Sequence, residues 1–468
     1  MSQHTHLLSP LDQHAPRVYT RMALIFPVTD YEPAISNLQD ALSKTCSQLP
    51  FLKGKVFEKG ADDRRQAYIT WNSGDPGPQL EEIPEPEGIP SYEILRQDRS
   101  PLPAGIFPKV VPRAEAGFEA PVLAASYTKI DGGLVICIAA YHKVLDGGGY
   151  GEILRVLAEN TRTSHADGVT GGLDADDILM RRERLQGGLP EMPKHVRSLD
   201  FDEILKHHPE YSLKSRQSQL HGAAAPGTPK AGAGVNKVIA FSKQKLDLIR
   251  AALSDKLPAR QLTVNNILTA IIWTSVTYVR TLRAEQPIST TSKMDFSVSG
   301  RRFLGPAMID PPYLGNCLGY ALTERPLDEL SFIPSLDTIE RLVPTIKAIA
   351  TATGHLSTDF MYEIIELPNK NPDLTDLIPS WFLYGPLDLH FTSWAQIGIY
   401  DLDFGPHIGR PQYMRTVVSE FEGIVTFLPR KRVEEGNESI EASVLLKAED
   451  MERLSSDEAW RSWLFKDE

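Results

Sequence analysis

The chain has 468 residues, of which 41% are hydrophobic and 24% are charged, and these values are ordinary for a globular protein of two or three domains. Its formal net charge of −12 argues against nucleic acid as a partner. Its three cysteines, Cys46, Cys137 and Cys317, form no CxxC pair, so neither a disulfide framework nor a zinc site is expected. Because no signal peptide or long apolar run is found, we expect a cytoplasmic protein without membrane contact.

The first half of the chain predicts a mixture of strands and helices. Residues 17–26 alternate weakly, as in a strand, and apolar residues at helical spacing predict a helix over 35–49. The strongest strand pattern covers 122–141, where an Asp-Gly-Gly turn indicates a hairpin. The second strand of this hairpin, Leu134–Tyr141, is almost continuously apolar and should be buried on both faces. A helix is predicted over 149–161.

A segment with almost no large apolar side chain separates the two halves. Residues 217–235 are rich in Gly, Ala, Pro, Ser and Gln, and such a composition cannot bury enough surface to order itself strongly. We therefore predict an N-terminal lobe (1–206), a flexible crossover linker (207–236) and a C-terminal lobe (237–468).

The second half again mixes strands and helices. A strand over 238–241 precedes a helix over 243–254, for which Ser242 is a suitable N-cap. The largely apolar segment 263–282 predicts a deeply buried helix. Further helices are predicted over 336–350, 355–365 and 451–465, and strands over 391–404 and 416–428. Strict βαβ repetition is absent, so two α/β lobes with mixed sheets are the simplest architecture.

One short segment contains the residues best suited to chemistry. His142 ends the apolar strand, Asp146 follows four positions later, and three glycines follow Asp146. A neutral imidazole is the usual proton acceptor near neutral pH, and glycines allow a ligand to approach the backbone closely. His142 is therefore the candidate general base. Asp146 could orient the imidazole, but its place just before a helix favours a structural, capping role.

Other catalytic arrangements have no support in the sequence. It contains no Gly-x-Ser-x-Gly elbow, no cysteine beside a base and no Gly-rich phosphate loop. This favours direct transfer, in which the base activates the substrate itself. The pair His207-His208 is interpreted as solvated and not as a metal site.

Several segments, in the same order along the chain, resemble the BAHD-type acyl-CoA-dependent acyltransferases of plants and fungi. The N-terminal segment is similar to the fungal branch, which includes trichothecene 3-O-acetyltransferase. The matching segments are 9–12 (SPLD), 142–147 (HKVLDG, the HxxxDG motif), 299–302 (SGRR), 313–316 (YLGN), 392–394 (TSW) and 403–405 (DFG).

The chain also departs from the family pattern. Ser299 replaces the family's aspartate, and the segment after Gly405 is two residues longer than usual. Peptide-synthetase condensation domains are related and carry HHxxxDG, but Tyr141 stands in place of their first histidine. The acyltransferases are therefore the better match.

The resemblance implies roles for individual residues. His142 would take the proton from an acceptor hydroxyl, and the indole of Trp394 would stabilise the oxyanion. Asp146 would turn away from the substrate and pair with Arg301, while Gly147 would support the same loop.

The DFG-like segment would lie far from the reacting atoms in this family. The resemblance therefore makes Asp403 and Gly405 structural residues with some influence on CoA binding. It requires no metal, and it leaves the residues that bind CoA unassigned.

The resemblance also implies a fold and an activity. The fold would be two lobes similar to chloramphenicol acetyltransferase, with an active-site tunnel between them. The predicted reaction transfers an acyl group, expected to be acetyl, from acyl-CoA to a hydroxyl of a fungal-type secondary metabolite. The enzyme is expected to be a monomer. The alternatives are N-acyl transfer, a CoA-independent condensation or cyclisation in the same fold, and a non-catalytic ligand-binding protein.

Overall fold

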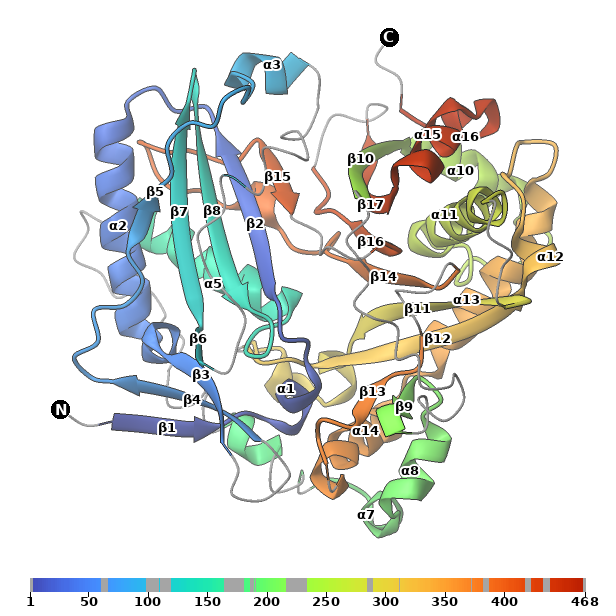
Figure 1. The fold of residues 1–468 in the computed structure, drawn as a ribbon, viewed down its shortest axis with the longest axis horizontal. Coiled ribbons are helices and arrows are strands. Elements are labelled where there is room, and N and C mark those ends of the chain that lie inside the picture. Colours follow the sequence, from blue (N-terminus) through green and yellow to red (C-terminus); the bar gives the residue numbers. More distant parts are fainter. Residues whose placement is uncertain are drawn as a thin grey trace.

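Two main sheets, each covered by helices, divide the molecule into two lobes (Figure 1). No helix in the part of the chain described here is long and apolar enough to cross a membrane. The computed structural model describes residues 3–59, 66–97, 109, 119–163, 181–185, 189, 191–215, 234–283, 289–310, 312–371, 373–381, 387–416, 422–431 and 438–465.

The first lobe is built around strand β8 (Gly133–Tyr141), and every residue of β8 is buried, as predicted. β8 pairs antiparallel with β2 (Tyr19–Phe26) and β7 (Leu123–Ile130). Helices α2 (Tyr31–Gln48) and α5 (Gly147–Arg162) pack together and share the core of this lobe. The five-stranded sheet has the order β15-β2-β8-β7-β5, with β15 at Tyr413–Thr416 and β5 at Leu80–Glu82.

A smaller antiparallel sheet lies at the N-terminal end of the first lobe (Figure 1). Helix α1 (Pro10–His14) directly follows the first strand of this sheet. The helix begins with a capping box between Ser9 and Asp12. Helix α3 (Tyr92–Gln97) lies on the opposite end of the lobe. The sheet order is β1 (Gln3–Leu7), β4 (Gln66–Asn72), β3 (Lys55–Lys59) and β6 (Glu119–Pro121).

The second lobe contains a six-stranded mixed sheet in which β14 runs parallel to both of its neighbours. Helix α11 (Val264–Thr281) is buried on almost all sides, as its apolar sequence predicts. Helices α11 and α13 (Val343–His355) share the core with this sheet. The strand order is β10 (Gly234–Ser242), β17 (Ser439–Lys447), β16 (Ile424–Phe427), β14 (Leu389–Ser393), β11 (Thr291–Ser299) and β12 (Leu318–Pro326).

Shorter elements complete the second lobe. Ser242 caps its helix, as predicted, by accepting from the Lys245 N–H. The remaining elements are α7 (Lys194–Ser198), α8 (Phe201–His207), β9 (Tyr211–Leu213), α10 (Lys243–Ala252), α12 (Leu327–Leu330), α14 (Thr358–Lys370), β13 (Leu377–Pro379), α15 (Ala448–Ser456) and α16 (Glu458–Ser462).

Each lobe takes a segment from the other half of the chain. β15 pairs with β2 of the first lobe, and Phe404 and Met414 lie in that lobe's core. Conversely, Val196 and Ile204 pack in the core of the second lobe. The boundaries at 206 and 237 stay a prediction, and most of the predicted flexible linker, residues 216–233, lies outside the described residues.

Several predicted elements are wrong in extent; the helix predicted over 336–350, for example, is α13 (Val343–His355) preceded by a 3-10 turn at Ile339–Leu342. The strand predicted over 391–404 ends at Ser393, because the chain turns there and the Ile397 N–H donates to the Trp394 carbonyl. The strand predicted over 416–428 is two strands that belong to different sheets, and the helix over 451–465 is α15 followed by α16. Apolar periodicity continues across such turns, so it does not locate them.

Candidate active site

His142 follows the last residue of β8, at the junction of the two lobes. Its backbone N–H donates to the carbonyl of Val18 in the first lobe (2.9 Å), and its carbonyl accepts from Asn316 Nδ2 (2.8 Å). Asn316 lies just before β12 of the second lobe. Both lobes therefore fix the backbone of this histidine.

The imidazole of His142 is half-buried. Burial lowers the pKa of His142, and this effect exceeds the opposing effects of its own backbone carbonyl and of Asp146. A lowered pKa keeps the ring neutral at pH 7, so that one nitrogen has a lone pair that can accept a proton.

The carboxylate of Asp146 bonds to groups other than His142. Its Oδ2 accepts from Arg301 Nη1 (2.9 Å) and the Cys317 N–H (2.9 Å), and its Oδ1 accepts from Arg301 Nη2 (2.8 Å) and the Gly149 N–H (2.9 Å). The bond from Gly149 caps helix α5. Burial alone would raise the pKa of Asp146, but the charge and hydrogen bonds of Arg301, together with the N–H groups of Gly149 and Cys317, outweigh burial and lower it. Asp146 is therefore a buried, ionised anchor.

Arg301 connects this anchor to the second lobe. Its guanidinium also donates to the carbonyls of Tyr313 (3.0 Å from Nε, 2.8 Å from Nη2) and Gly315 (2.9 Å). One side chain thus ties the start of α5 to the loop before β12. The sequence motifs around His142 and Arg301 meet in space although 155 residues separate Asp146 from Arg301.

The glycine run after Asp146 allows the second lobe to approach α5. A Cβ on Gly149 would overlap the backbone carbonyl of Leu314, and a Cβ on Gly147 would lie 3.1 Å from Trp394 Nε1. The indole of Trp394 therefore lies against the loop that begins at His142. Trp394 directly follows β14 and is half-buried.

Asp403 and Gly405 lie at the other end of α5. Asp403 Oδ1 accepts from the Gly405 N–H (2.9 Å), and Gly405 has a φ of +84° and would place a Cβ only 2.9 Å from Arg162 Cα. Helix α5 has 16 residues, or about 24 Å at 1.5 Å per residue, and Arg162 is its last residue. The DFG-like turn is therefore remote from the His142 loop.

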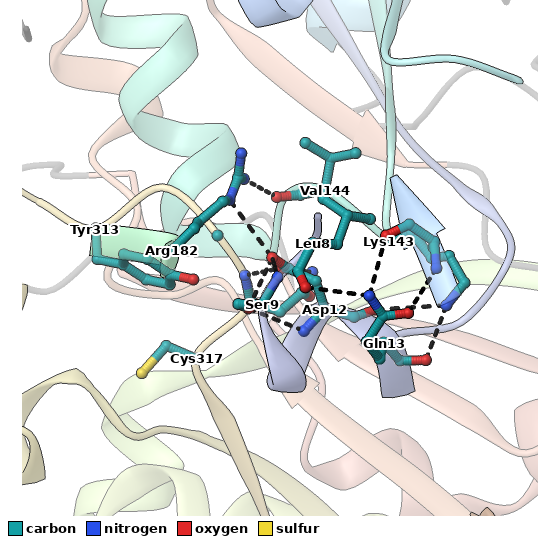
Figure 2. Close-up of polar contacts among 12 residues, drawn as sticks. Leu8, Ser9, Asp12, Gln13, Lys143, Val144, Arg182, Tyr313 and Cys317 are labelled. Atoms are coloured by element: carbon teal, nitrogen blue, oxygen red, sulfur yellow. Dashed lines mark hydrogen bonds and ion pairs between the residues drawn. The ribbon is translucent and has the colours of Figure 1, made fainter. Parts of the chain in front are cut away.

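Sequence reasoning missed a buried network around Asp12 (Figure 2). Asp12 Oδ1 accepts from the backbone N–H (2.8 Å) and the side-chain Nδ2 (2.9 Å) of Asn316. Because Asn316 Nδ2 also donates to the His142 carbonyl, the N-terminal helix α1 supports the histidine through one intermediate. The capping-box spacing of Ser9 and Asp12 was visible in the sequence, but the contact across 304 residues was not.

Two buried cations complete the support of the His142 loop. Lys143 Nζ donates to the Gln13 carbonyl (2.8 Å), and burial lowers the pKa of Lys143 to about 8. Arg182 Nη2 donates to the Val144 carbonyl (2.6 Å), and its Nε lies 3.4 Å from Asp12 Oδ2. Figure 2 shows Lys143 reaching from this loop to Gln13 of α1, and Arg182 lying between Val144 and Asp12.

A second histidine–aspartate combination lies in the second lobe and was also missed. His390 Nδ1 lies 2.9 and 2.8 Å from the two carboxylate oxygens of Asp295. The residues are opposite each other in the parallel strands β14 and β11. No sequence motif pointed to either residue, because 95 positions separate them.

The interpretation of His207-His208 as a solvated pair is wrong for His208. His208 is buried, with Nδ1 2.7 Å from Glu210 Oε1 and Nε2 3.1 Å from Glu363 Oε2. Packing of α8 on α14 covers it, which a local sequence pattern does not show. The described residues contain no group of three or more His, Cys, Asp and Glu side chains that could hold a metal ion.

The fold and the joined motifs define the class of protein as a two-lobed acyltransferase of the BAHD type. Residues 93–459 match the model of the Transferase family, and residues 18–160 match that of the trichothecene 3-O-acetyltransferase-like N-terminal domain. The chain therefore belongs to the Transferase family. The fungal branch predicted from the sequence is confirmed.

Relatives match along nearly the entire chain. The trichothecene 8-O-acetyltransferase of Fusarium sporotrichioides is 28% identical, with 98% of each sequence covered. The crystal structure of F. sporotrichioides TRI101 with coenzyme A and T-2 has a TM-score of 0.75 at 22% identity, covering 98% of this chain and 99% of that one. Vinorine synthase has a TM-score of 0.58 at 17% identity, with 100% and 98% covered. These structures confirm the predicted two-lobed fold.

Proposed function

We propose that this enzyme transfers an acyl group from acyl-CoA to a hydroxyl of a fungal-type secondary metabolite, with acetyl as the expected acyl group and His142 as the general base. The observation that carries the proposal is the position of His142: both lobes fix its backbone, and its loop lies against the indole of Trp394 at Gly147. Burial lowers the pKa of His142, which favours the neutral ring that a general base needs. The trichothecene 8-O-acetyltransferase relative and the coenzyme A in the TRI101 structure support the reaction class and the acyl donor.

In the proposed reaction, the His142 imidazole removes the proton of the acceptor hydroxyl as its oxygen attacks the thioester carbonyl. The indole N–H of Trp394 donates to the oxyanion that develops on that carbonyl. The intermediate then collapses with cleavage of the C–S bond, and the imidazolium returns its proton to the CoA thiolate. No acyl-enzyme forms, and the histidine ends in its initial state.

The remaining predicted residues support this geometry. Asp146 and Arg301 hold the loop after His142 against the second lobe, and Gly147 leaves room for the indole of Trp394. Asp403 and Gly405 shape the turn at the far end of α5 and influence CoA binding only indirectly, through the fold.

The test is replacement of the base. His142→Ala should reduce acyl transfer by about 10²- to 10⁴-fold, the range for loss of a general base, whereas the exposed His407 should tolerate His407→Ala. Activity of His142→Ala within a few-fold of wild type would overturn the proposed role of His142.

The acyl donor and acceptor need a separate measurement. Metabolite pools incubated with acetyl-CoA should give products heavier by one acetyl group, together with free CoA thiol. Products that form equally well without acetyl-CoA would instead indicate a condensation or cyclisation. Hydrolysis of the product at alkaline pH distinguishes an ester from an amide.

A further inference from the structure

The face of the second-lobe sheet that lies away from its core is polar around β14. Leu389 and Phe391 point into the core of the second lobe, so the alternation of the strand places His390 and Thr392 on the opposite face. Trp394, the residue that directly follows β14, donates its backbone N–H to the Phe427 carbonyl and lies against the His142 loop. His390 therefore faces away from the second-lobe core, on the strand that ends next to Trp394.

The ring of His390 is held in one orientation. Asp295 fixes Nδ1, Trp381 stacks on the ring at 5.8 Å between centroids and 7° between planes, and Tyr320 meets its edge. Such a fixed ring presents its other nitrogen, Nε2, in a constant direction.

The burial of this pair is unequal. The side chain of Asp295 is 0% exposed, whereas His390 keeps 18% of its side chain exposed. No described residue bonds to His390 Nε2, while His390 bonds to Asp295 through Nδ1. A buried carboxylate that holds a partly exposed imidazole is costly as a structural feature alone and is typical of functional sites.

His390 is also close enough to His142 to affect it. A positive charge on His390 lowers the pKa of His142. This electrostatic effect agrees with the position of His390 on β14, the strand that ends beside Trp394 and the His142 loop.

We propose that His390 is a specificity-determining residue that hydrogen-bonds, through Nε2, a second oxygen atom of the acceptor. This inference rests on the proposed function, in which His142 receives the first oxygen, the hydroxyl to be acylated. The preferred acceptor is then a polyoxygenated molecule that spans from His142 to His390. Asp295 is the positioning residue that keeps Nδ1 of His390 occupied.

The experiment compares matched terpenoid alcohols that differ by one additional hydroxyl or carbonyl oxygen. The readout is the ratio of kcat/KM for the two-oxygen and one-oxygen acceptors with acetyl-CoA. His390→Phe keeps a stacking ring but removes the nitrogen, and it should lower this ratio about 10-fold, mainly through a higher KM for the two-oxygen acceptor. His390→Gln, which keeps a polar end, should restore much of the ratio.

A matched control is His207→Phe, because His207 is a largely exposed histidine that lies outside the site and its replacement should leave the ratio unchanged. A ratio for His390→Phe within twofold of wild type would overturn the role of His390. If His390→Gln behaves like His390→Phe, the inference is likewise overturned. If the wild type acylates none of the acceptors, it is the proposed function that fails.

Discussion

Two histidine–aspartate combinations, one at the junction of the lobes and one within the second-lobe sheet, are built in opposite ways. His142 and Asp146 are four residues apart, yet the described structure shows no hydrogen bond between them, because Asp146 bonds to Arg301 and to two backbone N–H groups. His390 and Asp295 are 95 residues apart and are directly hydrogen-bonded. In both cases the carboxylate bonds to the donors that folding brings next to it, Arg301 for Asp146 and His390 for Asp295. Its distance from the histidine along the sequence does not decide the partner.

The comparison predicts that loss of Asp146 has the largest effect on stability. Asp146→Ala leaves Arg301 as an unpaired buried charge, and breaking such a pair costs about 3–5 kcal/mol. The free energy of unfolding, measured by urea denaturation, should fall by this amount, and activity should fall with it.

Asp403→Ala is the control for Asp146, since Asp403 makes a local bond to the Gly405 N–H and its loss should cost only about 1 kcal/mol. If Asp146→Ala abolishes activity but leaves stability unchanged, Asp146 orients His142, and the contrast between the two pairs is wrong.

Asp295→Asn should have a smaller effect on stability. The amide oxygen of asparagine can still accept from His390 Nδ1, so the expected loss is about 1–3 kcal/mol, as for one altered buried hydrogen bond. The same urea titration measures it. A loss as large as that of Asp146→Ala would show that both carboxylates anchor the fold equally.

The smallest expected effect is the change in stability with pH that results from the titration of His142. Because burial lowers the pKa of His142 in the folded state, the unfolded chain binds this proton first, near its ordinary pKa of ~6.5. The stability that the neutral ring contributes is present above that pH and is lost as pH falls toward the lower, folded pKa. Activity should fall over the same acidic range.

The measurement is the difference in free energy of unfolding between pH 7.5 and 5.5, in wild type and in His142→Ala. Other groups titrate in both proteins. Only the part of the pH-dependent difference in unfolding free energy that is lost in His142→Ala is therefore due to His142. An acid limb of activity above pH 6.5 would contradict a lowered pKa.

The sequence predicted the elements whose patterns are local and long. β8 is continuously apolar, α11 is apolar on nearly all sides, and Ser242 caps α10. Elements interrupted by a turn within one apolar pattern were placed wrongly, as after Ser393, because periodicity measures burial and not chain direction.

The sequence by itself determined the candidate base and its loop, since His142, Asp146 and the glycines are neighbours along the chain. Its resemblance to a family added Arg301. Only the tertiary structure decided which distant groups meet: Asp12 with Asn316, and His390 with Asp295. The physical reason is that these contacts form when the strands of one sheet align or when the two lobes pack together, and no local pattern of residues encodes either event.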